Sequence, residues 1–319
     1  MALNTEKTTA PSDALIKDLL DALDKVSGLH PGFRPVHAKG AICSGTFTPA
    51  AEAAKLTRAP HATRPSTRIV VRFSDSAGVP NVPDNDPMSG PRGFAIRFYL
   101  AEHVHTDIVS HSHDGFPTRT GEEFLQLFRA LPVSGPNAPK PTPLDTFLAS
   151  HPKAVEYLTA PKPFPSSFAR ESFFAVTAFK FTNSQGLSRF GRFRIRPELG
   201  NDHLTPEEAA KKSANFLFDD LAQRLAKGPI KYRIAVQIAA AEDQVADATI
   251  HWPASRPEIE FGTITLAKRE NDADLEMRKI IFDPIPRVDG IDLSGDPLSE
   301  VRAAIYLLSG RRRRAAIGG

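Results

Sequence analysis

The sequence predicts an α+β fold with a largely antiparallel sheet or barrel. Two groups of strand-like segments, within residues 67–111 and 173–267, alternate apolar with polar positions and are rich in β-branched and aromatic residues. Helical patterns lie before, between and after these groups, without the regular strand–helix alternation that is typical of parallel sheets. We therefore expect an antiparallel core with flanking helices.

The chain begins with a polar stretch, residues 1–12, that we expect to be a flexible lead-in. A helix is predicted from Asp13 to Val26, because apolar residues recur there at helical spacing. The first strand group follows. Its expected strands lie at 67–74, 92–100 and 106–111. We expect the lead-in and short helix (1–26) to precede a single domain that spans 27–319.

A second helix is predicted by the capping box Thr120-Gly-Glu-Glu123, and its apolar face includes Phe124. The next segment, 131–165, is dense in proline and is expected to be an excursion over the surface.

The second strand group starts with a hairpin around the turn Asn183-Ser-Gln-Gly186. The expected strands of this group and beyond it lie at 173–181, 191–196, 232–239, 261–267 and near 279–282. The capping box Thr205-Pro-Glu-Glu208 predicts a helix to about Ala226, with proline at its first position. A last helix is expected after Asp296 and Pro297, with Gly310 at its end.

Composition excludes several classes of function. The 319 residues are 41% hydrophobic and 24% charged, and a net charge of +3 does not indicate a nucleic-acid-binding protein. The run Arg311–Arg314 is expected to be a solvated end or a nonspecific anion patch. Cys43 is the single cysteine, which excludes an intramolecular disulfide and a cysteine-cluster metal site. The sequence shows no secretory signal and no apolar stretch of about 20 residues that could span a bilayer, so we expect a soluble, cytoplasmic protein without a membrane partner.

Two segments carry candidate chemistry. Arg302 and Tyr306 are four residues apart in the last predicted helix and therefore share a face. A guanidinium beside a phenol favours the phenolate, which is a hard anionic ligand for ferric iron. His37 stands between Arg34 and Lys39 in an apolar stretch that ends in glycine, and a histidine across the iron from the tyrosine could move a proton between two peroxide oxygens.

Several motifs resemble those of the haem catalases, in the same order and at similar spacing. The Val-His-Ala-Lys-Gly run at 36–40 resembles the family's distal segment, and Val71-Arg-Phe-Ser74, Ala77-Gly78 and Pro91-Arg-Gly-Phe-Ala95 resemble the segments that follow it. Phe282-Asp-Pro284 and Arg302-Ala-Ala-Ile-Tyr306 resemble the family's proximal end. The clear matches cover 34–128 and 277–313. The resemblance implies a catalase-like antiparallel β-barrel with flanking helices and a bound haem b.

The resemblance also implies roles for individual residues. Tyr306 matches the proximal iron ligand, and Arg302 matches the arginine that holds this tyrosine as phenolate. His37 matches the distal acid–base histidine, and Ser74 the serine that orients its imidazole. The remaining matches are the propionate-binding arginines and a phenylalanine on the porphyrin face, namely Arg34, Arg72, Arg313 and Phe124. The run of four arginines leaves the register of Arg313 open.

Three positions depart from the family pattern. His111 follows Asp107-Ile-Val-Ser110, where the family carries a distal asparagine, and a histidine there could still donate a hydrogen bond to peroxide. Gly90 stands where an acidic channel residue is usual, and Ser76 where an apolar gate residue is usual. We also expect the chain to lack the family's long N-terminal arm and C-terminal domain, since only a dozen or so residues follow Tyr306. It is therefore closest to the small catalase-related peroxidases, and we expect a haem peroxidase that reduces hydrogen peroxide or organic hydroperoxides with a small organic donor. We expect a monomer or homodimer, and no NADPH.

Other functions remain open at this point. A small true catalase and a haem enzyme that rearranges fatty-acid hydroperoxides share the same motifs. A haem carrier or sensor would need no acid–base pair such as His37 with Ser74. A fourth interpretation is zinc or non-haem iron held by His103 with His105 and His111 with His113, because residues i and i+2 of a strand share a face.

Overall fold

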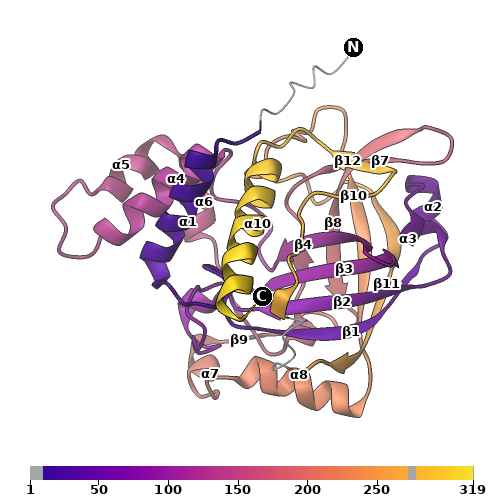
Figure 1. Ribbon diagram of the computed structural model, residues 1–319, viewed down its shortest axis with the longest axis horizontal. Helices are drawn as coiled ribbons and strands as arrows, with labels where there is room; N and C mark the ends of the chain where they lie inside the picture. The colour runs from indigo at the N-terminus through magenta and orange to yellow at the C-terminus, as the bar shows by residue number, and fades with distance from the viewer. Residues whose placement is uncertain (1–9, 272–277, 319) are drawn as a thin grey trace.

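The computed structural model describes residues 10–271 and 278–318. Its centre is an antiparallel barrel, drawn on the right of Figure 1, whose neighbouring strands are, in order, β10 (Ile230–Ile238), β11 (Glu258–Arg269), β1 (Gly40–Pro49), β2 (Thr67–Ser74), β3 (Gly93–Ala101), β4 (Val104–His111), β6 (Phe173–Phe174) and β8 (Ser188–Pro197). Pairing of β10 with β8 closes the ring. Beyond β8 the sheet continues through β7 (Phe179–Thr182) and β12 (Ile291–Leu293). The predicted antiparallel core with flanking helices is confirmed.

The inside of the barrel is filled by aromatic side chains. Phe73, Phe94, Phe173 and Tyr232 are buried and in ring contact, with 4.6 Å between the ring centroids of Phe94 and Phe173. The Tyr232 hydroxyl donates a hydrogen bond to the carbonyl of Phe168 over 2.6 Å, so its polar atom is satisfied inside the core. A packed interior leaves the outer wall of the barrel as the place for a binding site.

A group of helices flanks the barrel on one side (Figure 1). α1 (Asp13–Ser27), α4 (Gly121–Ala130) and α10 (Leu298–Ala316) share an apolar cluster, and Figure 1 shows α10 crossing beside β2, β3 and β4. On the far side of α4 lie α5 (Pro143–Ser150) and α6 (Pro152–Thr159). The remaining elements are the helices α2 (Ala53–Leu56), α3 (Pro60–Thr63), α7 (Pro206–Ala210) and α8 (Phe216–Lys227) and the short pair β5 (Phe164–Pro165) and β9 (His203–Leu204). Among the described residues, no helix combines the length and apolarity that crossing a membrane requires.

Most predicted elements are confirmed, including the first helix and the capping boxes at Thr120 and Thr205. Residues 1–9 of the predicted lead-in lie outside the described residues. The proline-dense excursion contains α5 and α6, which the prediction missed. Thr142 and Asp145 form a capping box there, and Pro143 occupies the first position of α5.

The strand predicted at 173–181 is interrupted between β6 and β7. Phe174 pairs with Arg194 and Phe179 with Gly191, so the first strand carries two more residues than its partner. This irregularity releases Thr177 from the ladder toward α10, where its hydroxyl oxygen accepts from Arg302 over 3.2 Å.

The helix predicted from Thr205 to Ala226 is broken between α7 and α8. At the break, the backbone carbonyl of Ala214 and the N–H of Leu217 bond to Asp84, which lies far away in the sequence. Tertiary hydrogen bonds therefore replace helical ones at this position.

Two expectations near the C-terminus are wrong. Residues 279–282 form no strand, because guanidinium groups bind the carbonyls of Ile280 and Ile281 where a neighbouring strand would have to pair. Gly310 does not end the last helix, which continues to Ala316. A Cβ at Gly310 would lie 2.3 Å from the side chain of Ile281, so this glycine allows close packing of α10 rather than capping it.

Candidate functional site

Sheet register brings residues of four neighbouring strands, candidate site residues among them, into one row. Gly40 pairs with Ser74, Ser74 with Gly93, and Gly93 with His111, so the row crosses β1, β2, β3 and β4. His37 lies three residues before Gly40, where the chain enters β1. The predicted residues His37, Ser74 and His111 are thus brought together at one end of the barrel wall.

His37 is held in a conformation that few non-glycine residues adopt. Its φ is 57°, and its backbone N–H donates to the carbonyl of Ser76 over 2.8 Å. Its Nδ1 lies 3.1 Å from the hydroxyl of Ser74, which leaves Nε2 as the ring nitrogen available for a substrate. Burial, followed by the charges of Arg72 and Arg34, lowers the pKa of His37 to about 3, so the imidazole is neutral at ordinary pH. A neutral, oriented imidazole is suited to accept a proton.

Gly93 is a site residue to which the sequence analysis assigned no role. A Cβ at this position would lie 2.4 Å from the Ser74 hydroxyl oxygen and 2.8 Å from His37 Nδ1. Any larger side chain would therefore displace the pair. The motif Pro91-Arg-Gly-Phe was a signal for this position, but only the register of β2 and β3 reveals the contact.

His111 has a defined tautomer. Its Nδ1 accepts the backbone N–H of His113 over 3.3 Å, so the ring proton of the neutral form is on Nε2. Burial, with the positive charge of Arg302, lowers the pKa of His111 to about 3. Nε2 is buried and has no hydrogen-bond partner among the described residues. A buried N–H donor of this kind is costly unless a ligand accepts from it.

The predicted proximal pair lies on α10. Both Nε and Nη2 of Arg302 are 3.4 Å from the phenol oxygen of Tyr306, and Nη1 donates to Thr177 over 3.2 Å. Thr177 was missed by the sequence analysis because it occupies the unforeseen irregularity between β6 and β7. The arrangement places the Arg302 guanidinium next to the phenol oxygen of Tyr306 and fixes it there through Thr177.

A cluster of arginines lies at one end of the row. Arg34 and Arg313 both donate to the carbonyl of Ile280 over 2.9 Å, and Arg72 donates to the carbonyl of His37 over 2.9 Å. Burial and the neighbouring positive charges of Arg72, Arg313 and Arg278 lower the pKa of Arg34 well below its ordinary value. Burial and Arg313 likewise lower the pKa of Arg72 to about 9, although Asp75 opposes the change. Cations that repel one another and bind neutral carbonyls form a favourable site for a ligand with two carboxylates.

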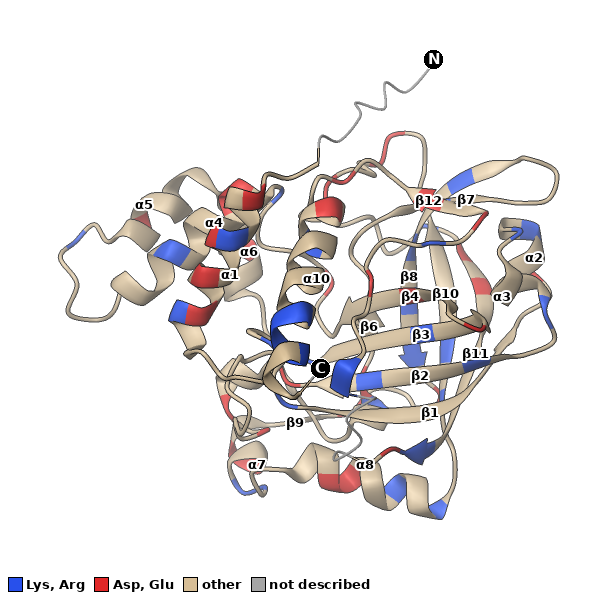
Figure 2. Ribbon diagram, in the orientation of Figure 1, with Lys and Arg blue, Asp and Glu red and all other residues tan. Residues whose placement is uncertain are grey.

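The structure distinguishes the four C-terminal arginines. Arg313 is buried, Arg312 bonds to Asp24 over 2.9 Å, and Arg311 and Arg314 are exposed. The run is therefore the last part of a helix rather than a solvated tail, and Arg313 is the member that faces Arg34. Figure 2 shows these basic residues at the C-terminal end of α10, close to the barrel wall.

Phe124 lies on α4, in the apolar cluster that also includes Tyr306. Its ring stacks on Phe116 with 5.4 Å between centroids, and Phe116 in turn lies 6.0 Å from the guanidinium carbon of Arg302. Phe124 is thus near the candidate site, on the side formed by helices.

The alternative metal site receives no support. His103 is fully exposed at the start of β4, whereas His111 and His113 lie at or beyond its other end. Within residues 10–271 and 278–318, no three histidine, cysteine, aspartate or glutamate side chains are grouped as metal ligands would be.

Comparison with known proteins gives a consistent result. The catalase family model matches residues 13–317. Two relatives are each named "Catalase-related peroxidase": the protein of Mycolicibacterium paratuberculosis is 32% identical over 92% of this chain and 93% of its own length, and that of Synechococcus elongatus is 30% identical over 92% and 87%. "Catalase-2" of Bacillus subtilis is 31% identical over 86% of this chain but only 42% of its own length.

Solved structures agree in fold. A fungal catalase superposes with a TM-score of 0.77 at 23% identity, covering 98% of this chain and 65% of the fungal chain. A bacterial catalase superposes with a TM-score of 0.75 at 25% identity, covering 98% of this chain and 64% of the bacterial chain.

Proposed function

Because the chain belongs to the catalase family, we propose that it is a haem-dependent peroxidase that reduces hydrogen peroxide or organic hydroperoxides with electrons from a small organic donor. The match in length supports this activity. The chain covers 93% and 87% of two relatives named catalase-related peroxidase, but less than half of the larger Catalase-2.

The residues present fit a haem b group. Tyr306, polarised by Arg302, would be the iron ligand, and Phe124 would pack on the porphyrin face. Arg34, Arg72 and Arg313 would bind the two propionates by charge-assisted hydrogen bonds. This fits their hydrogen bonds in the described part of the chain, in which each guanidinium donates to a neutral backbone carbonyl. The buried Nε2 of His111, which has no hydrogen-bond partner within the described ranges, supports a ligand on the distal side.

The protein's own contribution to the reaction is proton transfer and orientation. The haem, when bound, supplies redox-active iron. His37 accepts a proton from one oxygen of the peroxide and delivers it to the other, which becomes the leaving water or alcohol. Ser74 keeps the His37 ring in position at Nδ1. Nε2–H of His111 donates a hydrogen bond to the substrate oxygen, as the amide of an asparagine would. Overall, the O–O bond of the peroxide is broken and its two oxygens leave as two waters, or as water and an alcohol; the two electrons and two protons that this requires come from two donor molecules, one of each per donor.

The observation that carries this proposal is the placement of His37 beside the row residues Ser74, Gly93 and His111, with Arg302 near enough to act electrostatically on both histidines. A carrier of haem would gain nothing from a base oriented by a serine. The fixed donor at His111 favours a second candidate, a small true catalase, because it can stabilise a second peroxide as the reductant.

Steady-state rates with hydrogen peroxide separate the two candidates. A peroxidase oxidises an added phenol such as guaiacol and releases little oxygen. Oxygen release that exceeds phenol oxidation would favour the catalase. If the haem-loaded protein neither oxidises the phenol nor releases oxygen when hydrogen peroxide is added, both candidates are contradicted.

We extend the proposal to the organisation of the protein: residues 27–319 act as one haem-binding domain, after the lead-in and helix of 1–26. We further propose a monomer or homodimer in the cytoplasm. Sedimentation of the haem-loaded protein and cell fractionation test these two statements.

A further inference from the structure

We infer that Asp75 and Arg92, together with Lys39 and Asp84, form a buried positioning unit that sets His37 and His111 relative to each other. The inference rests on the proposed function, because it assigns these four residues to the geometry of the peroxide site. None of them touches the substrate in this scheme. They act through the backbone segments that carry the two histidines.

The unit begins directly beside His37. Asp75 follows Ser74, and its backbone N–H donates to the carbonyl of Lys39 over 3.2 Å. The neighbouring backbone bonds, from His37 to Ser76 over 2.8 Å and from Ala38 to Ala77 over 3.0 Å, hold the His37 segment against residues 75–77. The position of His37 therefore follows the position of this short segment.

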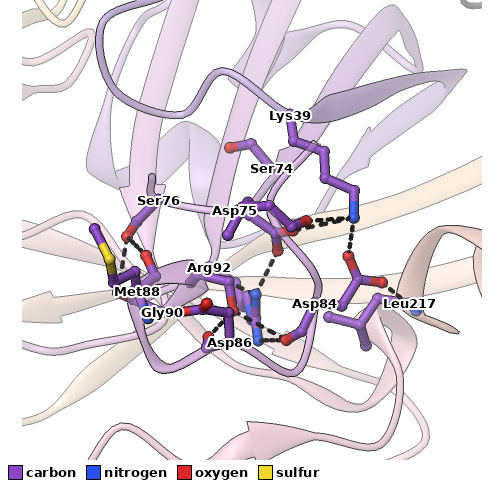
Figure 3. Close-up of polar contacts among 12 residues, drawn as sticks. Lys39, Ser74, Asp75, Ser76, Asp84, Asp86, Met88, Gly90, Arg92 and Leu217 are labelled. Atoms are coloured by element: carbon purple, nitrogen blue, oxygen red, sulfur yellow. Dashed lines mark hydrogen bonds and ion pairs between the residues drawn. The ribbon is translucent and has the colours of Figure 1, made fainter. Parts of the chain in front are cut away.

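The side chain of Asp75 anchors the segment to β3. Its carboxylate accepts from Nη1 of Arg92, and both side chains are buried, with 0% and 2% of their surfaces exposed (Figure 3). Arg92 also donates to the carbonyl of Ser89 over 3.0 Å and to the carbonyl of Asp84 over 2.5 Å. A guanidinium with three fixed acceptors has little freedom to move.

Arg92 connects this anchor to the second histidine. Its backbone N–H donates to the hydroxyl of Ser112 over 2.9 Å, and its carbonyl accepts the N–H of Ser112 over 2.8 Å. Ser112 lies between His111 and His113, and it is the N–H of His113 that fixes the tautomer of His111.

Arg92 also immediately precedes Gly93, which packs against His37 and Ser74. One residue thus links both histidines.

Lys39 and Asp84 complete the charge balance. Nζ of Lys39 lies 2.5 Å from one Asp84 oxygen and 3.7 Å from Oδ2 of Asp75, and the other Asp84 oxygen accepts the N–H of Leu217 over 2.7 Å. Figure 3 shows the chain of contacts from Arg92 through Asp75 and Lys39 to the first turn of α8. Two cations and two carboxylates compensate one another, so removal of one charge leaves another buried and unpaired.

A positional role makes a different prediction from a purely structural ion pair. Displacement of a catalytic group by about 1 Å can cost about 100-fold in rate, whereas a structural pair affects only stability. Asp75→Asn keeps the shape of the side chain but removes its charge from Arg92. We expect kcat/KM for hydrogen peroxide, per haem-loaded folded protein, to fall at least tenfold.

Cyanide binding gives a readout that does not depend on turnover. Hydrogen cyanide gives its proton to a distal base when it binds ferric haem, so its equilibrium affinity, followed by the Soret band, reports on the distal histidines. We expect Asp75→Asn to weaken cyanide binding at least tenfold while haem content stays unchanged. Ser112→Ala, which removes the acceptor of the Arg92 N–H, should weaken it in the same direction by a smaller factor.

Asp86→Asn is the matched control. Asp86 lies in the same loop and caps the turn at 87–89 through the N–H of Met88 over 2.8 Å, and no hydrogen bond or ion pair joins its side chain to Lys39 or Arg92 in the described structure. Asparagine can also accept that bond, so cyanide affinity and kcat/KM should match the wild type.

Unchanged cyanide affinity and kcat/KM in both Asp75→Asn and Ser112→Ala, even with a lower melting temperature, would overturn the inference. If Asp75→Asn does not fold, Ser112→Ala decides alone. If the wild type binds haem and cyanide but oxidises no donor, the proposed function fails, and the order of cyanide affinities among the variants still tests the positioning unit.

Discussion

Gly93 lies so close to His37 that a Cβ on the glycine would be 2.8 Å from Nδ1 of the histidine. The same Cβ would be 2.4 Å from the hydroxyl oxygen of Ser74, the partner of that nitrogen. A single missing methyl group on β3 therefore provides the space in which the distal pair is oriented.

Gly93→Ala should preserve the fold but displace the pair, because the atoms it meets belong to side chains rather than to backbone. We expect kcat/KM for peroxide to fall between about tenfold and 100-fold. Gly135→Ala is the control, since nothing lies within 4 Å of a Cβ at that position. Equal kinetics in the two variants would show that the contact at Gly93 has no functional consequence.

His37→Ala should retain the haem and lose the proton transfer. General acid–base groups typically contribute a factor of 10² to 10⁴, so we expect peroxide turnover to slow at least about 100-fold. Ser74→Ala keeps the imidazole but loses its hydroxyl partner at 3.1 Å, and should cause a smaller decrease. Stopped-flow reaction with peroxide measures both. Full activity in His37→Ala would show that the mechanism is wrong.

His111→Asn and His111→Leu separate hydrogen bonding from shape. Asparagine can donate from its amide as Nε2–H does, whereas leucine offers no donor. We expect His111→Asn to keep activity within about tenfold of the wild type and His111→Leu to lose about 100-fold, as removal of one preorganised donor typically does. Similar losses in both variants would mean that the hydrogen bond from His111 is not used.

The arginine cluster should determine haem retention. Arg34→Leu and Arg313→Leu each remove a buried or half-buried guanidinium from the end of the row, and each should weaken haem affinity by about tenfold or more, as loss of a charge-assisted hydrogen bond implies. Arg311→Leu, on the exposed side of the same helix, is the control. Haem titration followed by absorbance provides the measurement, and equal affinities in all three variants would contradict the assignment.

The buried His61 should make the folded state less stable at acidic pH. It is buried among the aromatic rings of the barrel, 4.7 Å from the ring centroid of Phe98, and burial lowers its pKa to about 3. The unfolded chain binds a proton below pH ~6.5 and the folded chain does not, so stability is lost as the pH falls from about 6.5 toward 3.

At pH 5 this histidine costs about 2 kcal/mol relative to neutral pH, from one and a half pH units at about 1.4 kcal/mol each. His61→Leu should therefore remove that part of the acid sensitivity. Urea unfolding of the wild type and the variant at pH 5 and pH 7.5 tests this, and an identical pH dependence in both would refute the pKa of His61.

Much of the fold could be predicted from local sequence. The first helix was predicted correctly from the helical spacing of Leu15, Leu19 and Leu23, and α4 from the capping box at Thr120. Both signals depend only on residues that are close together in the sequence. The row that joins Gly40, Ser74, Gly93 and His111 could not be derived in the same way. It depends on strand register, which is set by closure of the whole barrel.

The position of Arg313 on α10 could have been predicted from the sequence. Arg302, Tyr306, Ser309 and Arg313 follow helical spacing and lie on one face of α10. The incorrect prediction that the helix ends at Gly310 left Arg313 outside this face. The contact of Thr177 with Arg302 could not be predicted, because it depends on the two surplus residues between β6 and β7.

The central claim is that this chain holds haem through Tyr306 and uses it with peroxide. The most direct measurement is the absorption spectrum of the purified, haem-loaded protein before and after peroxide, with oxygen release and phenol oxidation followed in parallel. The account predicts one haem per chain, a high-spin ferric spectrum typical of tyrosinate ligation, a spectral change on adding peroxide, and rapid phenol oxidation with little oxygen. Failure to bind haem, or a spectrum that Tyr306→Phe leaves unchanged, would contradict it.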